Sequence, residues 1–148
     1  MKLLPNPKKN LQFSPGLIAG ENGSQFGIYL RKHVIKKMDF SIGLRVVRKS
    51  SDIVLIRCNG WHGAHPNKLH VGTPFSVIPP NTCHVHVATH AYLDVFHPQE
   101  PNSSFAQVAT GYNCFGSALQ YFLEEYGFVD PKTGKQLVKS PLLNFGAP

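Results

Sequence analysis

The sequence lacks several features that would place a protein in a class at once. It has no apolar run near the roughly eighteen residues that a transmembrane helix needs. Its first ten residues carry three lysines without an apolar stretch behind them, which argues against a secretory signal. The motifs H-E-x-x-H, G-x-x-x-x-G-K-S/T and G-x-S-x-G are absent, which excludes zincins, P-loop enzymes and α/β-hydrolases. We therefore expect a cytoplasmic protein with no membrane segment.

Cysteine and acidic residues are scarce as well. Cys58, Cys83 and Cys114 are an odd number without C-x-x-C spacing, which argues against a disulfide framework and against a thiolate zinc knuckle. Residues 1–70 hold twelve Lys and Arg but only three acids, whereas residues 71–148 hold three Lys and five acids. A polyanion-binding face would produce such a basic half, and so would a solvated surface that keeps the protein soluble.

The hydrophobic pattern predicts a single α+β domain over residues 1–148. Residues 1–24 are rich in Pro, Asn, Gly and Ser, and we interpret them as a loosely ordered N-terminal arm. Apolar residues at helical spacing predict a helix over 115–126, with Asn113 as its cap and Gly127 at its end. We expect a mainly antiparallel sheet with this one long C-terminal helix packed on one face. The predicted strands are 25–33, 39–48, 53–58 and 82–89, followed by a terminal hairpin within 128–138.

Histidines are the sharpest local anomaly of the chain. Six of the eight lie within residues 62–90, a window that contains no Asp or Glu. His84 and His86 alternate with apolar residues, so on a strand their side chains point to the same face, roughly 6.5–7 Å apart. A loop after Cys58 carries His62 and His65 and can bring them to the same place if strand 53–58 neighbours the histidine strand. The histidines should then line the sheet face opposite the helix, or the sheet edge.

Converging imidazoles suit metal-independent cleavage of RNA. One imidazole removes the proton of a ribose 2′-hydroxyl and another protonates the leaving oxygen, because a pKa near 6.5 populates both forms at neutral pH. We expect His84 and His86 as acid and base, with His62 and His65 orienting or sharing these roles. A nearby cation would hold the phosphate, and the candidates are Arg57, Lys68 and Arg45.

Two other interpretations stay open. In the first, His62, His65, His84 and His86 bind Zn²⁺ or another first-row metal; their outer nitrogens would then need backbone oxygens, because the window holds no carboxylate. In the second, the chain is a non-catalytic interaction or inhibitor protein with a protein partner. Trp61 is interpreted as a base-stacking residue or a core anchor. Asn67 is interpreted as a turn residue first and a substrate contact second.

Two strings of the sequence resemble a known kind of protein. Residues 58–67 read C-N-G-W-H-G-A-H-P-N and residues 84–89 read H-V-H-V-A-T. They resemble small bacterial proteins that share a G-x-H-x-x-H-x-N loop and an H-x-H-x-A-T strand and are similar in kind to toxins of toxin–antitoxin modules. The resemblance spans about residues 55–126. It implies attack on RNA or translation, an antitoxin as partner, and functional roles for the matching positions His62, His65, Asn67, His84 and His86.

The histidine strand also resembles that of the histidine-triad nucleotide hydrolases, but Ala88 stands where those enzymes have a third histidine. From the sequence we therefore predict a metal-independent ribonuclease, with a zinc enzyme or a non-catalytic protein as the alternatives. The predicted catalytic residues are His62, His65, His84 and His86. The predicted substrate-binding residues are Arg57, Trp61, Asn67 and Lys68.

Overall fold

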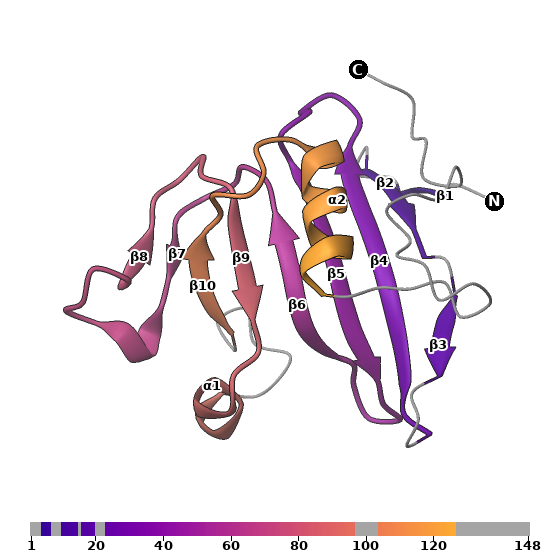
Figure 1. Cartoon of the computed structure of the whole chain (residues 1–148), viewed down its shortest axis with the longest axis horizontal. Helices are drawn as coiled ribbons and strands as arrows, with labels where there is room; N and C mark the ends of the chain where they lie inside the picture. Colours follow the sequence, from indigo (N-terminus) through magenta and orange to yellow (C-terminus); the bar gives the residue numbers. More distant parts are fainter. Residues whose placement is uncertain (1–3, 7–9, 15, 20–22, 97–103, 127–148) are drawn as a thin grey trace.

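An antiparallel sheet forms the centre of the computed structural model, which describes residues 4–6, 10–14, 16–19, 23–96 and 104–126 (Figure 1). The strands in chain order are β1 (Leu4–Asn6), β2 (Asn10–Phe13), β3 (Leu17–Ala19), β4 (Gln25–His33), β5 (Phe40–Val47), β6 (Ile53–Asn59), β9 (His84–Val87) and β10 (Phe105–Val108). Their spatial order is β1-β2-β4-β5-β6-β9-β10, with β3 also paired to β4. A separate pair, β7 (His65–Pro66) and β8 (Val77–Ile78), lies in the connection between β6 and β9.

The fold class is confirmed as α+β with a mainly antiparallel sheet, and the helical part differs from the prediction. The described residues contain two α-helices, α1 (His90–Val95) and α2 (Phe115–Glu125), together with a 3-10 turn over Lys68–His70. Helix α2 lies where the C-terminal helix was predicted, but it has only eleven residues and α1 is a second helix, so the expectation of one long helix is wrong. Cys114, not Asn113, caps α2. Its sulfur accepts from the Ser117 N–H, and the Ser117 hydroxyl oxygen accepts from the Cys114 N–H. Gly127 and the predicted terminal hairpin lie outside the described residues.

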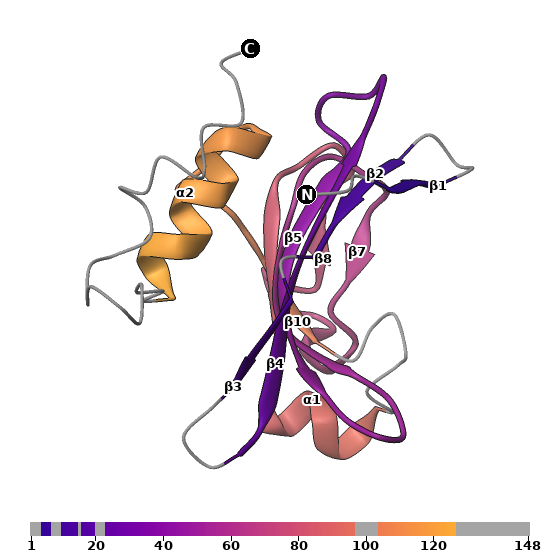
Figure 2. The same cartoon turned by 90° about the vertical axis from the view of Figure 1, so that its right-hand side faces the viewer.

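The hydrophobic core lies between the sheet and α2. Strands β4, β5, β6 and β9 alternate as their sequences predict, so every second side chain points toward the helix. Helix α2 covers this face, while β7 and β8 lie on the other side of the sheet (Figure 2). The buried apolar side chains of this core include Ile28, Leu30, Phe40, Ile42, Cys58, Val85, Ala118, Leu119 and Phe122.

Four strands of the sheet, β1, β2, β3 and β10, lie where the sequence pattern indicated no element. Strands β2 and β3 both pair with β4, and β1 pairs with β2. All three residues of β3 are exposed, which explains why no apolar alternation marked the strand. None of the helices in the described residues is long and apolar enough to cross a membrane.

Candidate functional site

Polar side chains run in two rows across the sheet face opposite α2. Strand register pairs Ser41 with Asn59 and Asn59 with His84, which forms the first row. The second row pairs Arg57 with His86 in the same way. Because directly paired residues of neighbouring strands project to the same side of a sheet, these side chains meet on one face. The sheet thus presents polar groups to the connection that carries His62 and His65.

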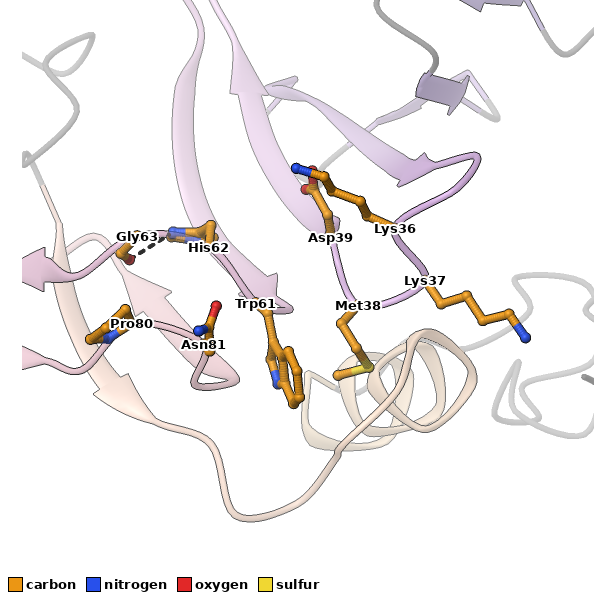
Figure 3. Close-up of a pocket in the computed structure, with 9 residues that line it drawn as sticks. All are labelled: Lys36, Lys37, Met38, Asp39, Trp61, His62, Gly63, Pro80 and Asn81. Carbon is orange, nitrogen blue, oxygen red and sulfur yellow. Dashed lines mark hydrogen bonds between the residues drawn. The ribbon is translucent and has the colours of Figure 1, made fainter.

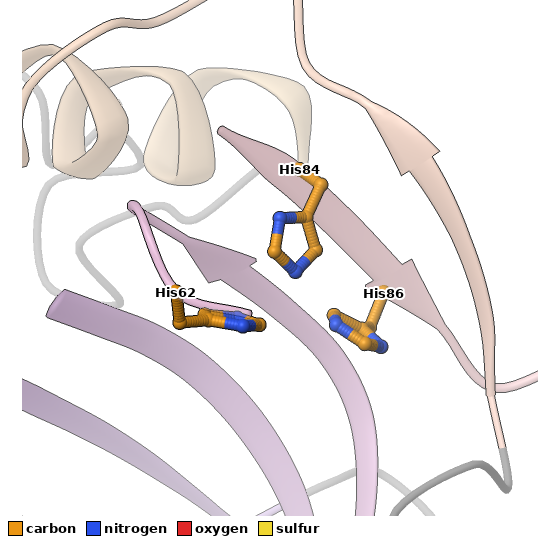
Figure 4. A group of neighbouring side chains, drawn as sticks. All are labelled: His62, His84 and His86. Carbon is orange, nitrogen blue, oxygen red and sulfur yellow. The ribbon is translucent and has the colours of Figure 1, made fainter. Parts of the chain in front are cut away.

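Imidazoles from the loop and from β9 meet above these rows. Figure 4 shows His62 reaching from the end of β6 toward His84 and His86. The ring centroids of His62 and His84 are 4.4 Å apart and those of His84 and His86 are 4.9 Å apart. One ring nitrogen of each of the three lies within 4.8 Å of the others, so the group could hold a metal ion. The His65 ring lies 4.3 Å from that of His86, which makes it the fourth member of the cluster.

Asn67 holds the loop in this position. The side chain is completely buried, and its Oδ1 accepts from the Ala106 N–H at 2.8 Å. Its Nδ2 donates to the Ala106 carbonyl at 2.6 Å and to the Phe75 carbonyl at 2.7 Å. The amide therefore bonds the free N–H and carbonyl on the edge of β10, as a neighbouring strand would. It also fixes the backbone two residues after His65. In the structure the side-chain amide of Asn67 is used in hydrogen bonds within the fold.

Hydrogen bonds determine which nitrogen of His62 and of His84 carries the proton. A carbonyl oxygen only accepts, so His62 Nδ1–H donates to the Gly63 carbonyl at 3.2 Å. By the same rule, His84 Nδ1–H donates to the Thr82 carbonyl at 2.7 Å. Both rings therefore keep a lone pair on Nε2, which is the state that a metal ligand needs. The outer partners of both imidazoles are backbone oxygens.

His86 reaches the same protonation state by a different route. A guanidinium only donates, so Arg57 Nη2 donates to His86 Nε2 at 3.3 Å. The proton of His86 is then on Nδ1 and points to the Ser104 hydroxyl at 3.1 Å. His62, His84 and His86 consequently share one tautomer, in which Nδ1 carries the proton and Nε2 is the acceptor.

Burial keeps the cluster neutral. It lowers the pKa of His65 and that of His84 from 6.5 to about 4, with Arg57 adding to the effect in both cases. Burial also lowers the pKa of His62, and it lowers the pKa of His86 furthest, where Arg57 is the second cause. At neutral pH the four rings are uncharged, a state that favours coordination of a metal and disfavours proton donation.

A partly buried cation lies beside the histidines. Burial lowers the pKa of the Arg57 guanidinium, and neighbouring Tyr29 counteracts this shift. Tyr29 can approach because Gly43 lies between it and Arg57 on β5, where a Cβ atom would collide with the tyrosine ring. Arg57 Nε and His65 Nε2 are both buried and lack a hydrogen-bond partner among the described residues. These unsatisfied donors and acceptors favour a bound ligand at this position.

The remaining predicted residues lie apart from the cluster or at its rim. Lys68 Nζ lies 5.5 Å from the Phe96 ring centroid, and no contact with the four histidines is seen for it within the described chain. Arg45 pairs with Asp52 at 2.9 Å. Trp61 is 47% exposed and lines a pocket together with His62. Sequence reasoning missed Tyr29 and Asn59, although a lone glycine inside a strand was a signal for close approach at Gly43.

Comparisons of the sequence with protein-family models and with curated proteins, and of the fold with solved structures, find no match. The functional assignment therefore depends on the site itself.

Proposed function

We propose that the protein is a metal-dependent hydrolase in which His62, His84 and His86 bind a first-row transition metal and the substrate is an RNA phosphodiester. The observation that carries the proposal is the convergence of the three rings, because one ring nitrogen of each lies within 4.8 Å of the others. Zinc is the ion that we propose, because three imidazole ligands with an open position are typical of catalytic zinc.

The protonation state favours this mechanism over the metal-free one. With a pKa of about 4, only about one His84 ring in a thousand carries a second proton at pH 7. Protonating such a ring at pH 7, so that it can act as a general acid, costs roughly 4 kcal/mol, whereas a metal ligand must be neutral in any case. When bound, such an ion acidifies a coordinated water and polarises a phosphoryl oxygen.

The protein's own groups complete the site in this proposal. A bound ion would replace the contact of Arg57 Nη2 with His86 Nε2, and Arg57 would then supply a positive charge for the phosphate oxygens. Asn59 Nδ2 lies 3.4 Å from His84 Nε2, and its Oδ1 accepts from the Ser41 hydroxyl at 2.7 Å. Asn59 and Ser41 thus lie against the sheet side of the His84 ring, where a bound ion would replace the Asn59 contact to Nε2, while the Thr82 carbonyl accepts from Nδ1.

A metal-independent ribonuclease is the second candidate, and Arg57 is the observation that favours it. A phosphate bound to this partly buried cation would place negative charge next to His86 and His65, which would raise the pKa of both rings and restore a proton donor. In either form, an enzyme that cleaves the RNA of its own cell requires an inhibitor. An antitoxin-like protein partner is part of this proposal.

Incubation of the purified protein with labelled single-stranded RNA tests the proposal. We expect cleavage by the zinc-loaded protein, loss of cleavage in chelator and recovery on adding Zn²⁺. His84→Ala and His86→Ala should abolish cleavage, whereas His90→Ala, an exposed position at the start of α1, should not. Cleavage that persists in chelator would reject the metal and favour the second candidate. If the zinc-loaded protein does not cleave RNA, the hydrolase is rejected and the interpretation as a non-catalytic protein is favoured.

A further inference from the structure

A pocket opens beside the histidine cluster on the side of the β4–β5 connection. It encloses about 570 Å³, within the roughly 300–1,000 Å³ of small-molecule sites. His62 belongs to both places, since it lines the pocket and its ring contacts that of His84. Figure 3 shows the Trp61 indole beside Met38, with His62 and Asn81 on the opposite wall. Residues far apart in sequence therefore build one cavity next to the site.

The walls of this pocket are held by the backbone. The Trp61 N–H donates to the Met38 carbonyl at 2.6 Å, and a Cβ atom at Gly60 would collide with the same carbonyl. The Asn81 N–H donates to the His62 carbonyl at 3.0 Å. Asn81 has a φ of 57°, in the left-handed region that non-glycine residues rarely adopt. The backbone that carries the exposed Trp61 ring is thus held in place.

The pocket combines this aromatic surface with positive charge. Lys36 and Lys37 are exposed residues of its lining. Among the described residues of the lining, only Asp39 has a carboxylate, and it forms an ion pair with Arg31 at 2.8 Å. Because Arg31 neutralises Asp39, the two lysines leave the rim positive. A pocket lined by an indole face and by lysines suits a ligand that has a flat aromatic ring and an anionic group.

From these observations we propose that the pocket binds one nucleotide of a single-stranded nucleic acid, with its base against Trp61 and its phosphate near Lys36 and Lys37. Stacking on an aromatic side chain tolerates any base, because every base has a π-face. Since His62 lies between the pocket and the other imidazoles, a strand held here runs its next phosphodiester toward the cluster. That last step depends on the proposed function; binding in the pocket does not.

Trp61 is the only tryptophan of the chain, so its fluorescence reports directly on the pocket. We would titrate the full protein, in chelator to prevent metal-dependent cleavage, with short single-stranded RNA and DNA, an abasic strand of equal length, and inorganic phosphate. We expect saturable quenching by the RNA and DNA strands only. Equal quenching by the abasic strand, or none by either base-bearing strand, would overturn the proposal, as would a response to an acidic peptide alone.

Variants separate the two parts of the recognition. Trp61→Ala should weaken binding of a labelled strand roughly 5- to 100-fold by anisotropy, and Trp61→Phe should recover part of the loss. The double variant Lys36→Ala/Lys37→Ala should weaken binding and lower the salt dependence, while Arg48→Ala/Lys49→Ala, two exposed basic residues outside the pocket lining, should do neither. Unchanged binding by the first double variant would exclude a phosphate site.

Failure of this proposal and failure of the proposed function are distinguishable. His84→Ala should retain quenching by the RNA strand, because His84 does not line the pocket. Quenching without cleavage would reject the hydrolase and keep the nucleotide pocket. Cleavage without quenching would keep the hydrolase and reject the pocket.

Discussion

Acidification should destabilise the metal-free protein strongly, because the fold holds its histidine cluster neutral. The pKa of His65 and of His84 falls from 6.5 to about 4 on folding. Below pH 6.5 the unfolded chain takes up protons that the folded chain does not, so unfolding becomes easier as the pH falls. The free energy of unfolding therefore keeps its full value above about pH 6.5, and it decreases as the pH falls from there to about 4.

The size of the effect follows from the same values. Each of these histidines has a pKa of about 4 in the folded chain and of 6.5 in the unfolded chain. This difference lowers the free energy of unfolding by about 2 kcal/mol for each histidine when the pH falls from 7.5 to 5. The two together approach about 4 kcal/mol, and His86 acts in the same direction because burial lowers its pKa as well. Such a loss is large against the roughly 5–15 kcal/mol by which domains are stable.

Urea unfolding in chelator at a series of pH values measures this, with circular dichroism as the signal. We expect His84→Gln to reduce the difference between pH 7.5 and 5 by about 2 kcal/mol, while His90→Gln, an exposed residue outside the cluster, keeps the wild-type difference. A wild-type free energy of unfolding that changes by less than about 1 kcal/mol over this range would refute the proposed burial of neutral rings.

Three further predictions concern the frame of the site. Asn67→Ala should lower the free energy of unfolding by about 2–4 kcal/mol in urea, because it leaves the buried N–H and carbonyl of Ala106 without partners; a loss below about 0.5 kcal/mol would contradict this. Gly43→Ala should cost about 1–3 kcal/mol by clashing with Tyr29, and adding Tyr29→Ala should relieve that clash in a double-mutant cycle. A thiol reagent should modify one exposed cysteine per native chain, and Cys114→Ser should abolish the reaction; rapid labelling that persists in this variant would show that a buried thiol is accessible.

The sequence predicted the central strands and the main helix because their patterns are long. Strands β4, β5 and β6 and helix α2 each have seven or more residues with clear periodicity. The placement of His84 and His86 opposite the helix followed from alternation alone, since Val85 between them had to face the core. Cys58 also behaves as expected: it is buried, which raises the pKa of its thiol to about 12.

Other parts of the site depend on contacts between distant residues. Strand β10 has only four residues with mixed exposure, so its sequence gave no alternation to detect. The pairing of Asn67 with Ala106 spans 39 positions, and nothing local to either residue indicates it. The pocket beside Trp61 forms only when the β4–β5 connection closes against the loop after β6. Its lysines were visible in the sequence only as part of the basic half.

Metal stoichiometry tests the central claim most directly. Elemental analysis after zinc loading and removal of excess metal should give about one Zn²⁺ per chain for the wild type and for His90→Ala. The same measurement on His84→Ala and His86→Ala should give substantially less, with circular dichroism confirming that the variants are folded. A wild-type protein that retains no zinc, or variants that retain as much as the wild type, would contradict a metal centre built from these histidines.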